Sequence, residues 1–252
     1  MSFYHKILEQ KDQGLKSLAV LIDPDGIKRN NLGLLIDLVN AYDIDFFLVG
    51  GSLLMQDELD ITIRQLKKSS DKPVVLFPGN EIQLHEEADA ILFLSLISGR
   101  NPEYLIAKHV VAAPRLKQMN VEVVSTGYML IHGRRPSTVS YISGTTPLPN
   151  DKPELAVATA LAGQYLGQQL IYLEGGSGAN RPISESTIKA VKNVLNVPLI
   201  VGGGIKTAEQ VRSIYQNGAD IQVIGTAIER RPENLKEIGR VKMEVNQQYT
   251  NI

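Results

Sequence analysis

Eight short apolar runs recur along the chain at nearly even spacing, and this spacing constrains the fold more than any other feature. Most runs are followed by glycine or a polar turn, and they cover Leu18–Ile22, Phe46–Val49, Val74–Phe77, Ala90–Leu94, Val121–Val124, Leu170–Leu173, Leu199–Val201 and Ile221–Ile224. Runs that are apolar at consecutive positions are typical of parallel strands buried on both faces. Their mean spacing of about 29 residues matches the ~30 residues expected of a strand with its crossover helix.

The segments between these runs predict helices. Four of them have amphipathic or alanine-rich sequences with helix-ending signals, at Asn30–Tyr42, Pro153–Tyr165, Ser184–Val194 and Thr207–Asn217. The third unit differs, because only 12 residues separate Phe77 from Ala90 and any helix there must be short. After Ile228 the chain predicts a polar closing helix. Eight alternating units without a linker favour a single α/β domain over residues 1–252, a (β/α)8 TIM barrel rather than a doubly wound sheet.

Composition narrows the function classes. The chain has 26 Lys and Arg against 27 Asp and Glu, a net charge of −1, which gives no support to nucleic-acid binding or to a basic membrane-surface patch. It has no cysteine, which excludes disulfides, thiolate metal sites and cysteine nucleophiles. The first residues are too polar for a signal peptide, and no apolar run is long enough to span a bilayer. We therefore expect a cytoplasmic protein that binds metal through oxygen or imidazole.

Glycine clusters follow the last two predicted strands. Gly202-Gly203-Gly204 follows the seventh strand, and Gly225-Thr226 follows the eighth. Glycine lets backbone N–H groups approach a phosphate, and a phosphate site after strands seven and eight is a recurring use of this barrel. The alternative is that these glycines only shape tight turns. Because both motifs occur at consecutive strand ends, we expect phosphate binding.

A carboxylate ends the sixth predicted strand. Glu174 is followed by Gly175-Gly176-Ser177-Gly178, so we expect its side chain at the mouth of the barrel. Beside a phosphate it would receive the polyol part of a phosphorylated substrate and act as a base. The alternative is a carboxylate in a salt bridge at the rim.

Oxygen-bearing side chains end the first two predicted strands. Asp23-Pro24-Asp25-Gly26 follows the first strand, and Gly50-Gly51-Ser52 follows the second. Carboxylate and hydroxyl oxygens without imidazole suit Mg²⁺, which takes further ligands from substrate phosphates. As alternatives, Asp23 could be a general base and Asp25 a helix cap.

Several other residues are weaker candidates, because a surface or packing role explains each as well as a functional one. An acidic stretch at Gln56–Asp60 reads as a solvated helix face. The long connection from Gly133 to Asn150 follows the fifth strand, where barrel sites are built. Residues that could contact substrate are Arg100 and Asn101, Arg134 and Arg135, His132, and Tyr128.

Together these segments resemble the geranylgeranylglyceryl phosphate synthase family of prenyltransferases. The resemblance runs from about residue 17 to 230 and rests on LIDPDG at 21–26, FFLVGGS at 46–52, VVLFPGN at 74–80, ADAILFLSLISGRNPEYLI at 88–106, STGYMLIHG at 125–133, the stretch at 145–180 that ends in YLEGGSGAN, PLIVGGGIKTAEQ at 198–210 and GADIQVIGTAIE at 218–229. The order and spacing of YLEGGSGA, VGGGI and IGTAI are its most specific part.

The resemblance implies a Mg²⁺-dependent transfer of a prenyl group from its diphosphate to the 3-hydroxyl of sn-glycerol 1-phosphate. Asp23 and Ser52 would then bind Mg²⁺, and Glu174 would orient and deprotonate the hydroxyl. The residues implied to hold glycerol phosphate are Tyr172, Leu173, Glu174, Gly175, Gly176, Ser177, Gly178, Gly203, Gly204, Gly225 and Thr226. Tyr128, Arg100 and Asn101 are candidate contacts for the prenyl diphosphate.

The donor is less well specified than the acceptor. Family members that resemble the Firmicute heptaprenyl enzymes carry lysine where this chain has Leu21, and residues 125–179 look closer to the archaeal type. This favours a geranylgeranyl donor. The prenyl chain needs a long apolar groove, which the sequence does not place, although the short third unit and apolar residues such as Leu96, Ile97 and Tyr104 could leave one open.

Two other functions remain open at this point. One is another phosphate-binding barrel enzyme, such as a sugar-phosphate isomerase, that uses Asp23 without Mg²⁺. The other is a non-catalytic barrel that binds a phospholipid precursor. In each case we expect a homo-oligomer, since exposed barrel helices often pair, with at most transient membrane contact.

Overall fold

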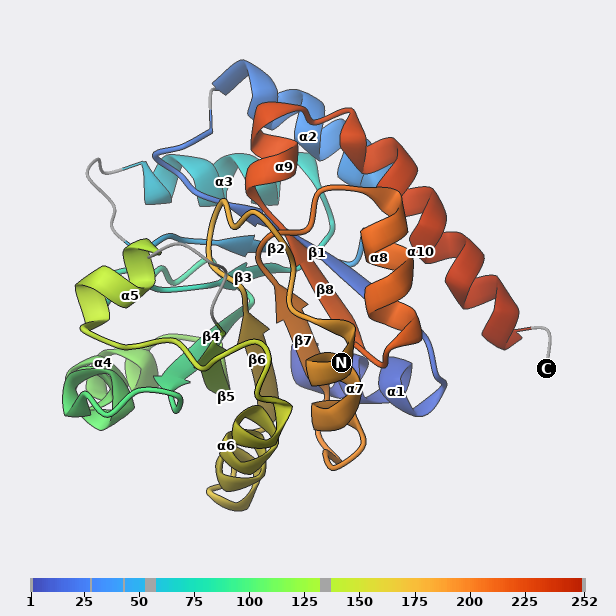
Figure 1. Cartoon of the computed structure of the whole chain (residues 1–252). Helices are drawn as coiled ribbons and strands as arrows, with labels where there is room; N and C mark the ends of the chain where they lie inside the picture. Colours follow the sequence, from blue (N-terminus) through green and yellow to red (C-terminus); the bar gives the residue numbers. More distant parts are fainter. Residues whose placement is uncertain (1, 28, 43, 53–57, 132–136, 251–252) are drawn as a thin grey trace.

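The computed structural model describes residues 2–27, 29–42, 44–52, 58–131 and 137–250. Its centre is a closed barrel of eight parallel strands in sequence order (Figure 1). The strands are β1 (Ser17–Ile22), β2 (Phe46–Val49), β3 (Val74–Leu76), β4 (Ala90–Leu96), β5 (Glu122–Leu130), β6 (Leu170–Glu174), β7 (Leu199–Gly202) and β8 (Ile221–Ile224). The predicted (β/α)8 TIM barrel is confirmed, and each strand overlaps one apolar run.

Helices surround the strands, with α1 at the end of the barrel where the strands begin and α9 at the end where they finish (Figure 1). The described helices are α1 (Phe3–Asp12), α2 (Arg29–Ala41), α3 (Leu59–Ser69), the π-helix η1 (Glu103–Ala107), α4 (Lys108–Gln118), α5 (Thr138–Ser143), α6 (Pro153–Tyr165), α7 (Glu185–Lys192), α8 (Ala208–Gln216), α9 (Thr226–Arg230) and α10 (Asn234–Thr250). The predicted closing helix is α10, which packs against α8 and α2.

The structure differs from the sequence prediction at two places. No helix forms in residues 77–89, all of which are described, so the unit after β3 lacks its crossover helix. Strand β5 continues to Leu130, beyond the predicted end at Val124, because it pairs with β6 from Thr126 onward. Ser125, Thr126 and Gly127 interrupt the apolar run, and hydrogen bonding on both sides overrides the weak strand preference of the glycine.

Apolar side chains form two layers. Along β1, Leu18, Val20 and Ile22 face the helices, while Ala19 faces the barrel interior with residues of the other strands. The interior is closed at its lower end by α1, whose Phe3 ring meets the Phe46 ring edge-on at 5.0 Å. This packed interior leaves the upper end of the barrel for a site.

Polar side chains fix the strand register at the lower end. In four strand pairs, the residue just before the even-numbered strand accepts a hydrogen bond. The donor is a backbone N–H in the first half of the preceding strand. The bonds run from Leu18 to Asp45 (2.7 Å), from Val74 to Asp89 (2.7 Å), from Ser125 to Gln169 (3.0 Å) and from Leu199 to Asp220 (2.8 Å). We call these four acceptors the register clamps.

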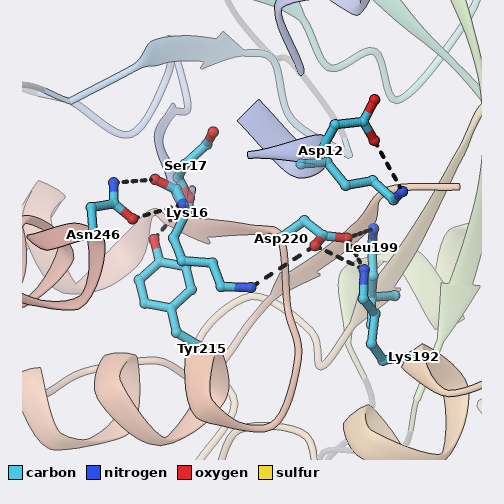
Figure 2. Close-up of polar contacts among 9 residues, drawn as sticks. Asp12, Lys16, Ser17, Lys192, Leu199, Tyr215, Asp220 and Asn246 are labelled. Atoms are coloured by element: carbon cyan, nitrogen blue, oxygen red, sulfur yellow. Dashed lines mark hydrogen bonds and ion pairs between the residues drawn. The ribbon is translucent and has the colours of Figure 1, made fainter. Parts of the chain in front are cut away.

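Figure 2 shows the clamp at Asp220. Its carboxylate accepts hydrogen bonds from Lys192 Nζ at 2.6 and 2.8 Å and lies 3.9 Å from Lys16 Nζ. Beside it the Tyr215 hydroxyl donates to the backbone oxygen of Ser17 at 2.8 Å, and Asn246 bonds the backbone of Lys16. The network ties β7, β8, β1 and α10 together where the barrel closes.

We predict that Asp220→Ala destabilises the protein more than Asp89→Ala. Both aspartates bond a strand N–H and a lysine, but the Asp220 side chain is 7% exposed and that of Asp89 is 38% exposed. Removing a buried ion-pair partner leaves a buried charge and typically costs about 3–5 kcal/mol, against about 1–2 kcal/mol for the hydrogen bonds of an exposed pair. Urea unfolding measures both. Equal losses would show that burial of the clamp is unimportant.

Candidate active site

A polar cavity of about 600 Å³ opens at the carboxyl ends of the strands. Many of the residues proposed from the sequence line it together: Asp23, Ser52, Tyr128, Tyr172, Glu174, Ser177, Gly178, Gly203, Gly204, Gly225 and Thr226. They come from β1, β2, β5, β6, β7 and β8 or from the loops that follow them. The barrel therefore brings to one place groups that are far apart in the sequence.

Glu174 lies at the upper end of β6 on the interior side of the barrel and is 6% exposed. The Gly176 N–H donates to its Oε1 at 2.6 Å. Burial raises the pKa of Glu174 to about 7, against the lowering effects of this N–H and the Tyr172 hydroxyl. Among the described residues it forms no ion pair, which argues against the alternative of a salt-bridged rim carboxylate. A carboxyl group that titrates near 7 is suited to general base catalysis.

Three aromatic rings stand next to Glu174. Phe77, Tyr128 and Tyr172 form a mutual cluster with ring centroids 5.3 to 5.9 Å apart. Burial raises the pKa of both tyrosines well above the ordinary value, so both are neutral. The buried Tyr172 hydroxyl approaches Glu174, yet it has no hydrogen bond of good geometry within the described structure. Such an orphaned group is suited to binding a ligand oxygen.

The glycines after β7 are required by their surroundings. Gly203 and Gly204 have positive φ values of 83° and 72°, which favour glycine. A Cβ on Gly203 would also collide with Glu174 Oε1, and one on Gly202 with the Tyr172 hydroxyl. The explanation that the glycines only shape turns is therefore incomplete, since they also make room for the functional side chains.

The loops after β6 and β8 meet in the cavity. Ser177 Oγ lies 3.2 Å from Thr226 Oγ1, which joins the loop after β6 to the loop after β8. Lys206, Arg230 and Arg231 line the same cavity. Hydroxyls, backbone of glycine loops and three cationic side chains together favour an anionic ligand.

Asp23 and Ser52 line the same cavity, and their chemistry fits a magnesium ion. Asp23 Oδ1 accepts a hydrogen bond from the Asp25 N–H at 3.1 Å. The carboxyl group lies against Gly51, where a Cβ would be 3.3 Å from both oxygens, and so next to Ser52. Burial raises the pKa of Asp23, and a bound cation would reverse this effect. A carboxylate and a hydroxyl leave most positions of such an ion to substrate oxygens.

An apolar cavity of about 110 Å³ adjoins the polar one. It extends over the outer face of β4, along Ile91 and Phe93, to Ala112 on α4, where the missing third helix would otherwise pack. Of the apolar residues considered for a groove, Leu96 and Tyr104 line this cavity, whereas Ile97 does not: its Cδ1 fills the space beside Gly127 and Gly163. Residues shared by both cavities are Gly51, Ser52, Phe77, Tyr128 and Val139.

Some predicted site residues do not reach either cavity. Arg100 is exposed and donates to the Gly99 backbone oxygen at 2.7 Å, and Asn101 Nδ2 donates to the Ser143 backbone oxygen at 2.8 Å. Leu173 faces the outer layer because it alternates with Tyr172 and Glu174. Gly175 and Gly176 support the site through their N–H groups, which bond the Gly202 backbone oxygen and Glu174.

Other candidates lie elsewhere. His132, Arg134 and Arg135 fall outside the described residues, as do Gln56 and Asp57. Asp60 belongs to the exposed face of α3, where it bonds His85 at 2.9 Å and Arg64 at 3.0 Å. This matches the interpretation of that stretch as a solvated helix face.

The structure adds residues that sequence reasoning missed. Phe77 was assigned only to a strand, Arg230 and Arg231 only to the polar tail, and Glu229 received no role. Glu229 lines the polar cavity and accepts a hydrogen bond from the Asp23 N–H at 3.1 Å. Its only sequence signal was its position, four residues after the Gly225 strand end.

Comparison with known proteins identifies the family of this chain. The profile of the PcrB family matches residues 6–242. The chain belongs to the PcrB family. Among curated proteins, the geranylgeranylglyceryl phosphate synthase of Spirosoma linguale is 48% identical over 95% of this PcrB chain and 96% of its own length. The enzyme of that name from Pyrococcus horikoshii is 42% identical, over 90% of this chain and 88% of its own. The family resemblance and the expectation of an enzyme are thus confirmed.

A solved structure of the same kind covers nearly the whole PcrB chain. It is the (S)-3-O-geranylgeranylglyceryl phosphate synthase of Thermoplasma acidophilum in complex with its substrate sn-glycerol-1-phosphate, with a TM-score of 0.91 and 32% identity over 97% of this chain and 99% of that one. The fold that positions Glu174 and the glycine loops is therefore shared with a protein that binds a phosphorylated polyol.

We predict that Glu174→Gln stabilises the ligand-free protein at neutral and alkaline pH. The raised pKa means that folding favours the protonated carboxyl, so its contribution to stability is full below pH 4.5 and is lost as pH rises to about 7. Glutamine keeps an acceptor for the Gly176 N–H and has no charge. The variant should exceed wild type by about 3 kcal/mol above pH 7, and the difference should vanish below pH 4.5. Urea unfolding across pH tests this, and a pH-independent difference would contradict it.

Proposed function

We propose that this protein is a Mg²⁺-dependent prenyltransferase that joins the geranylgeranyl group of geranylgeranyl diphosphate to the 3-hydroxyl of sn-glycerol 1-phosphate. The product is an ether and the leaving group is diphosphate. The observation that carries the proposal is the position of Glu174, a buried base that lines a cationic, glycine-lined polar cavity, which shares Phe77 and Tyr128 with an adjoining apolar cavity. A reaction between a phosphorylated polyol and a prenyl donor needs this arrangement.

In this proposal the acceptor binds to the loops after β6, β7 and β8. Its phosphate would bind backbone N–H groups near Gly204 and Gly225, the hydroxyls of Ser177 and Thr226, and the nearby cationic side chains. Its glycerol would then extend toward Glu174 and the Tyr172 hydroxyl. The complex of the Thermoplasma acidophilum enzyme with sn-glycerol-1-phosphate supports this choice of acceptor.

In this proposal the donor occupies the apolar cavity. Its prenyl chain would lie along β4 and α4, and its reacting carbon would enter past Phe77 and Tyr128, which line both cavities. As diphosphate departs, positive charge develops on that carbon. The faces of the aromatic cluster stabilise such charge while carrying none themselves.

Asp23 and Ser52 would hold Mg²⁺ near the donor's diphosphate. When bound, this ion neutralises charge on the leaving group. Asp23 is aligned for this by the Asp25 N–H, and Ser52 brings its hydroxyl to the junction of the two cavities.

Glu174 performs the proton transfer. Its ionised carboxylate removes the proton from the 3-hydroxyl of glycerol phosphate as that oxygen bonds to the prenyl carbon. The bond between this carbon and the diphosphate oxygen breaks, and its electron pair leaves with diphosphate. The proton stays on Glu174 until product leaves, and a pKa of about 7 permits its return to solvent.

The test is an assay with radiolabelled sn-glycerol 1-phosphate and prenyl diphosphates of different lengths, with products extracted into organic solvent. Wild type should form extractable product, fastest with geranylgeranyl diphosphate, and lose activity in EDTA. kcat/KM should rise with pH to about 7 as Glu174 ionises. Glu174→Gln should lower kcat by about 10²–10⁴-fold but still bind glycerol phosphate.

Each part of the proposal has its own contrary outcome. No extractable label with any donor would reject the function, including in favour of a binding barrel. Undiminished turnover in EDTA would reject the Mg²⁺ role. Full activity of Glu174→Gln would reject the base assignment. A homo-oligomer and transient membrane contact stay predictions.

A substitution in the apolar cavity separates donor from acceptor binding. Phe93 lies on the outer side of β4, and its ring packs edge-on against His109 at 4.5 Å. Phe93→Gln should raise the KM for the prenyl diphosphate about tenfold, because burying a side chain of this size contributes about 1.5–3 kcal/mol, and leave the KM for glycerol phosphate unchanged. Phe93→Met, which stays apolar, is the control. Equal effects on both substrates would place the donor elsewhere.

A further inference from the structure

Glu229 connects two parts of the polar cavity that the proposed function assigns to different substrates. It lies on α9, three residues after Thr226, and lines the cavity. Its Oε1 accepts the Asp23 N–H at 3.1 Å, a contact between residues that are 206 positions apart. The Asn31 side chain, from α2, donates to the Glu229 backbone oxygen at 3.4 Å. Both ends of the loop between β1 and α2 are therefore attached to α9.

The Asp23 N–H needs a hydrogen-bond acceptor from outside the sheet, because the pairing of β1 with β2 ends one residue earlier. The register of β1 with β2 ends at Ile22 opposite Val49, so Asp23 is the first residue beyond the ladder. A partly buried N–H left without an acceptor would be costly. Glu229 supplies an acceptor from the neighbouring strand end, and this fixes the backbone from which the Asp23 side chain projects.

The Asp23 side chain is fixed in turn by its own loop. The Asp25 N–H donates to its Oδ1, and the Gly26 N–H donates to its backbone oxygen at 3.0 Å. Glu229 holds the amide side of Asp23, and the following turn holds the carboxyl side. Loss of either contact would move the Asp23 carboxylate relative to Ser52.

We propose that Glu229 is a positioning residue that holds Asp23 in the geometry required for metal binding and couples it to the phosphate loop at Gly225 and Thr226. The inference rests on the proposed function, in which Asp23 is a metal ligand. Because Glu229 and Thr226 share one turn of α9, an acceptor phosphate that orders this turn also orders the Asp23 backbone. Acceptor binding and metal binding then strengthen each other.

This role needs an acceptor oxygen at position 229 but no negative charge there. Glu229→Gln keeps the oxygen and removes the charge, whereas Glu229→Ala removes both. A positioning role predicts that glutamine preserves function and alanine does not. A role as a direct metal ligand through its charge predicts that both fail.

The first measurement is Mn²⁺ binding, followed by electron paramagnetic resonance of the free ion, which requires no turnover. Loss of a group that orients a metal ligand typically weakens metal affinity about 10–100-fold, and we expect this for Glu229→Ala. Glu229→Gln should stay within about threefold of wild type on the same argument. Wild-type affinity in Glu229→Ala, or equal losses in both variants, would overturn the proposal.

A double mutant tests whether Glu229 acts through Asp23. If it does, adding Glu229→Ala to Asp23→Asn should weaken Mn²⁺ binding no further, since the two changes remove one interaction. Additive losses would contradict the proposal. Glu233→Ala, an exposed carboxylate beyond α9, is the matched control and should bind Mn²⁺ like wild type.

The second measurement is the affinity for sn-glycerol 1-phosphate by calorimetry, without and with saturating Mg²⁺ and pyrophosphate. Wild type and Glu229→Gln should bind the acceptor more tightly in the presence of the other two, and Glu229→Ala should lose this enhancement. An equal enhancement in Glu229→Ala would disprove the coupling. If wild type itself bound no Mn²⁺ and formed no ether, the proposed function would fail instead.

Discussion

The barrel depends on the hydrogen bonds that fix strand register at its lower end. A one-residue slip would exchange the two faces of a strand, which would turn Glu174 and Tyr172 outward. With the observed register, Tyr128 lies beside Tyr172, and Glu174 beside Gly202. The register clamps are thus at the opposite end of the strands from the site, yet they determine which side chains meet there.

Glycine on one strand serves the side chain of the next. Gly202 leaves space for the Tyr172 hydroxyl and Gly203 for the Glu174 carboxyl. The glycines of this loop therefore have two effects. They leave space for the side chains of Tyr172 and Glu174, and they let backbone N–H groups approach an anion. The chain has a net charge of only −1, which is compatible with anion binding because backbone N–H groups add no formal charge.

The absence of a crossover helix between β3 and β4 leaves an apolar cavity beside the polar one. Where a helix would cover β4, residues 77–89 form an irregular segment that is held by polar contacts. Gln83 bonds the Gly51 backbone oxygen and the Gly79 N–H, and Glu81 pairs with Lys108 on α4 at 2.7 Å. These bonds hold the segment in place without filling the space beneath it, so the apolar cavity persists.

Features that depend on neighbouring residues in the sequence could be predicted, and features that depend on contacts between distant residues could not. Strands, helices and glycine loops are set by local pattern, and these predictions hold. The short third unit is visible in the sequence, but the apolar cavity beside it, which Leu96 and Tyr104 line, could be located only in the structure. Ile97 and Arg100 were misplaced because side-chain direction depends on contacts with β5, α6 and the chain's own backbone. The Asp23–Glu229 contact spans 206 positions, and no local pattern signals it.

The carboxyl groups of Glu174 and Asp23 have different surroundings in the polar cavity. Glu174 is buried and forms no ion pair within the part of the chain that the structure describes, and burial raises its pKa to about 7, so it can change protonation state. Asp23 has hydrogen-bond donors around its carboxyl group and faces the site proposed for a divalent ion. A negatively charged donor and acceptor can occupy one cavity only if cations offset them. Lys206, Arg230 and Arg231, which line the cavity, and a metal ion beside Asp23 would divide that task between the two substrates.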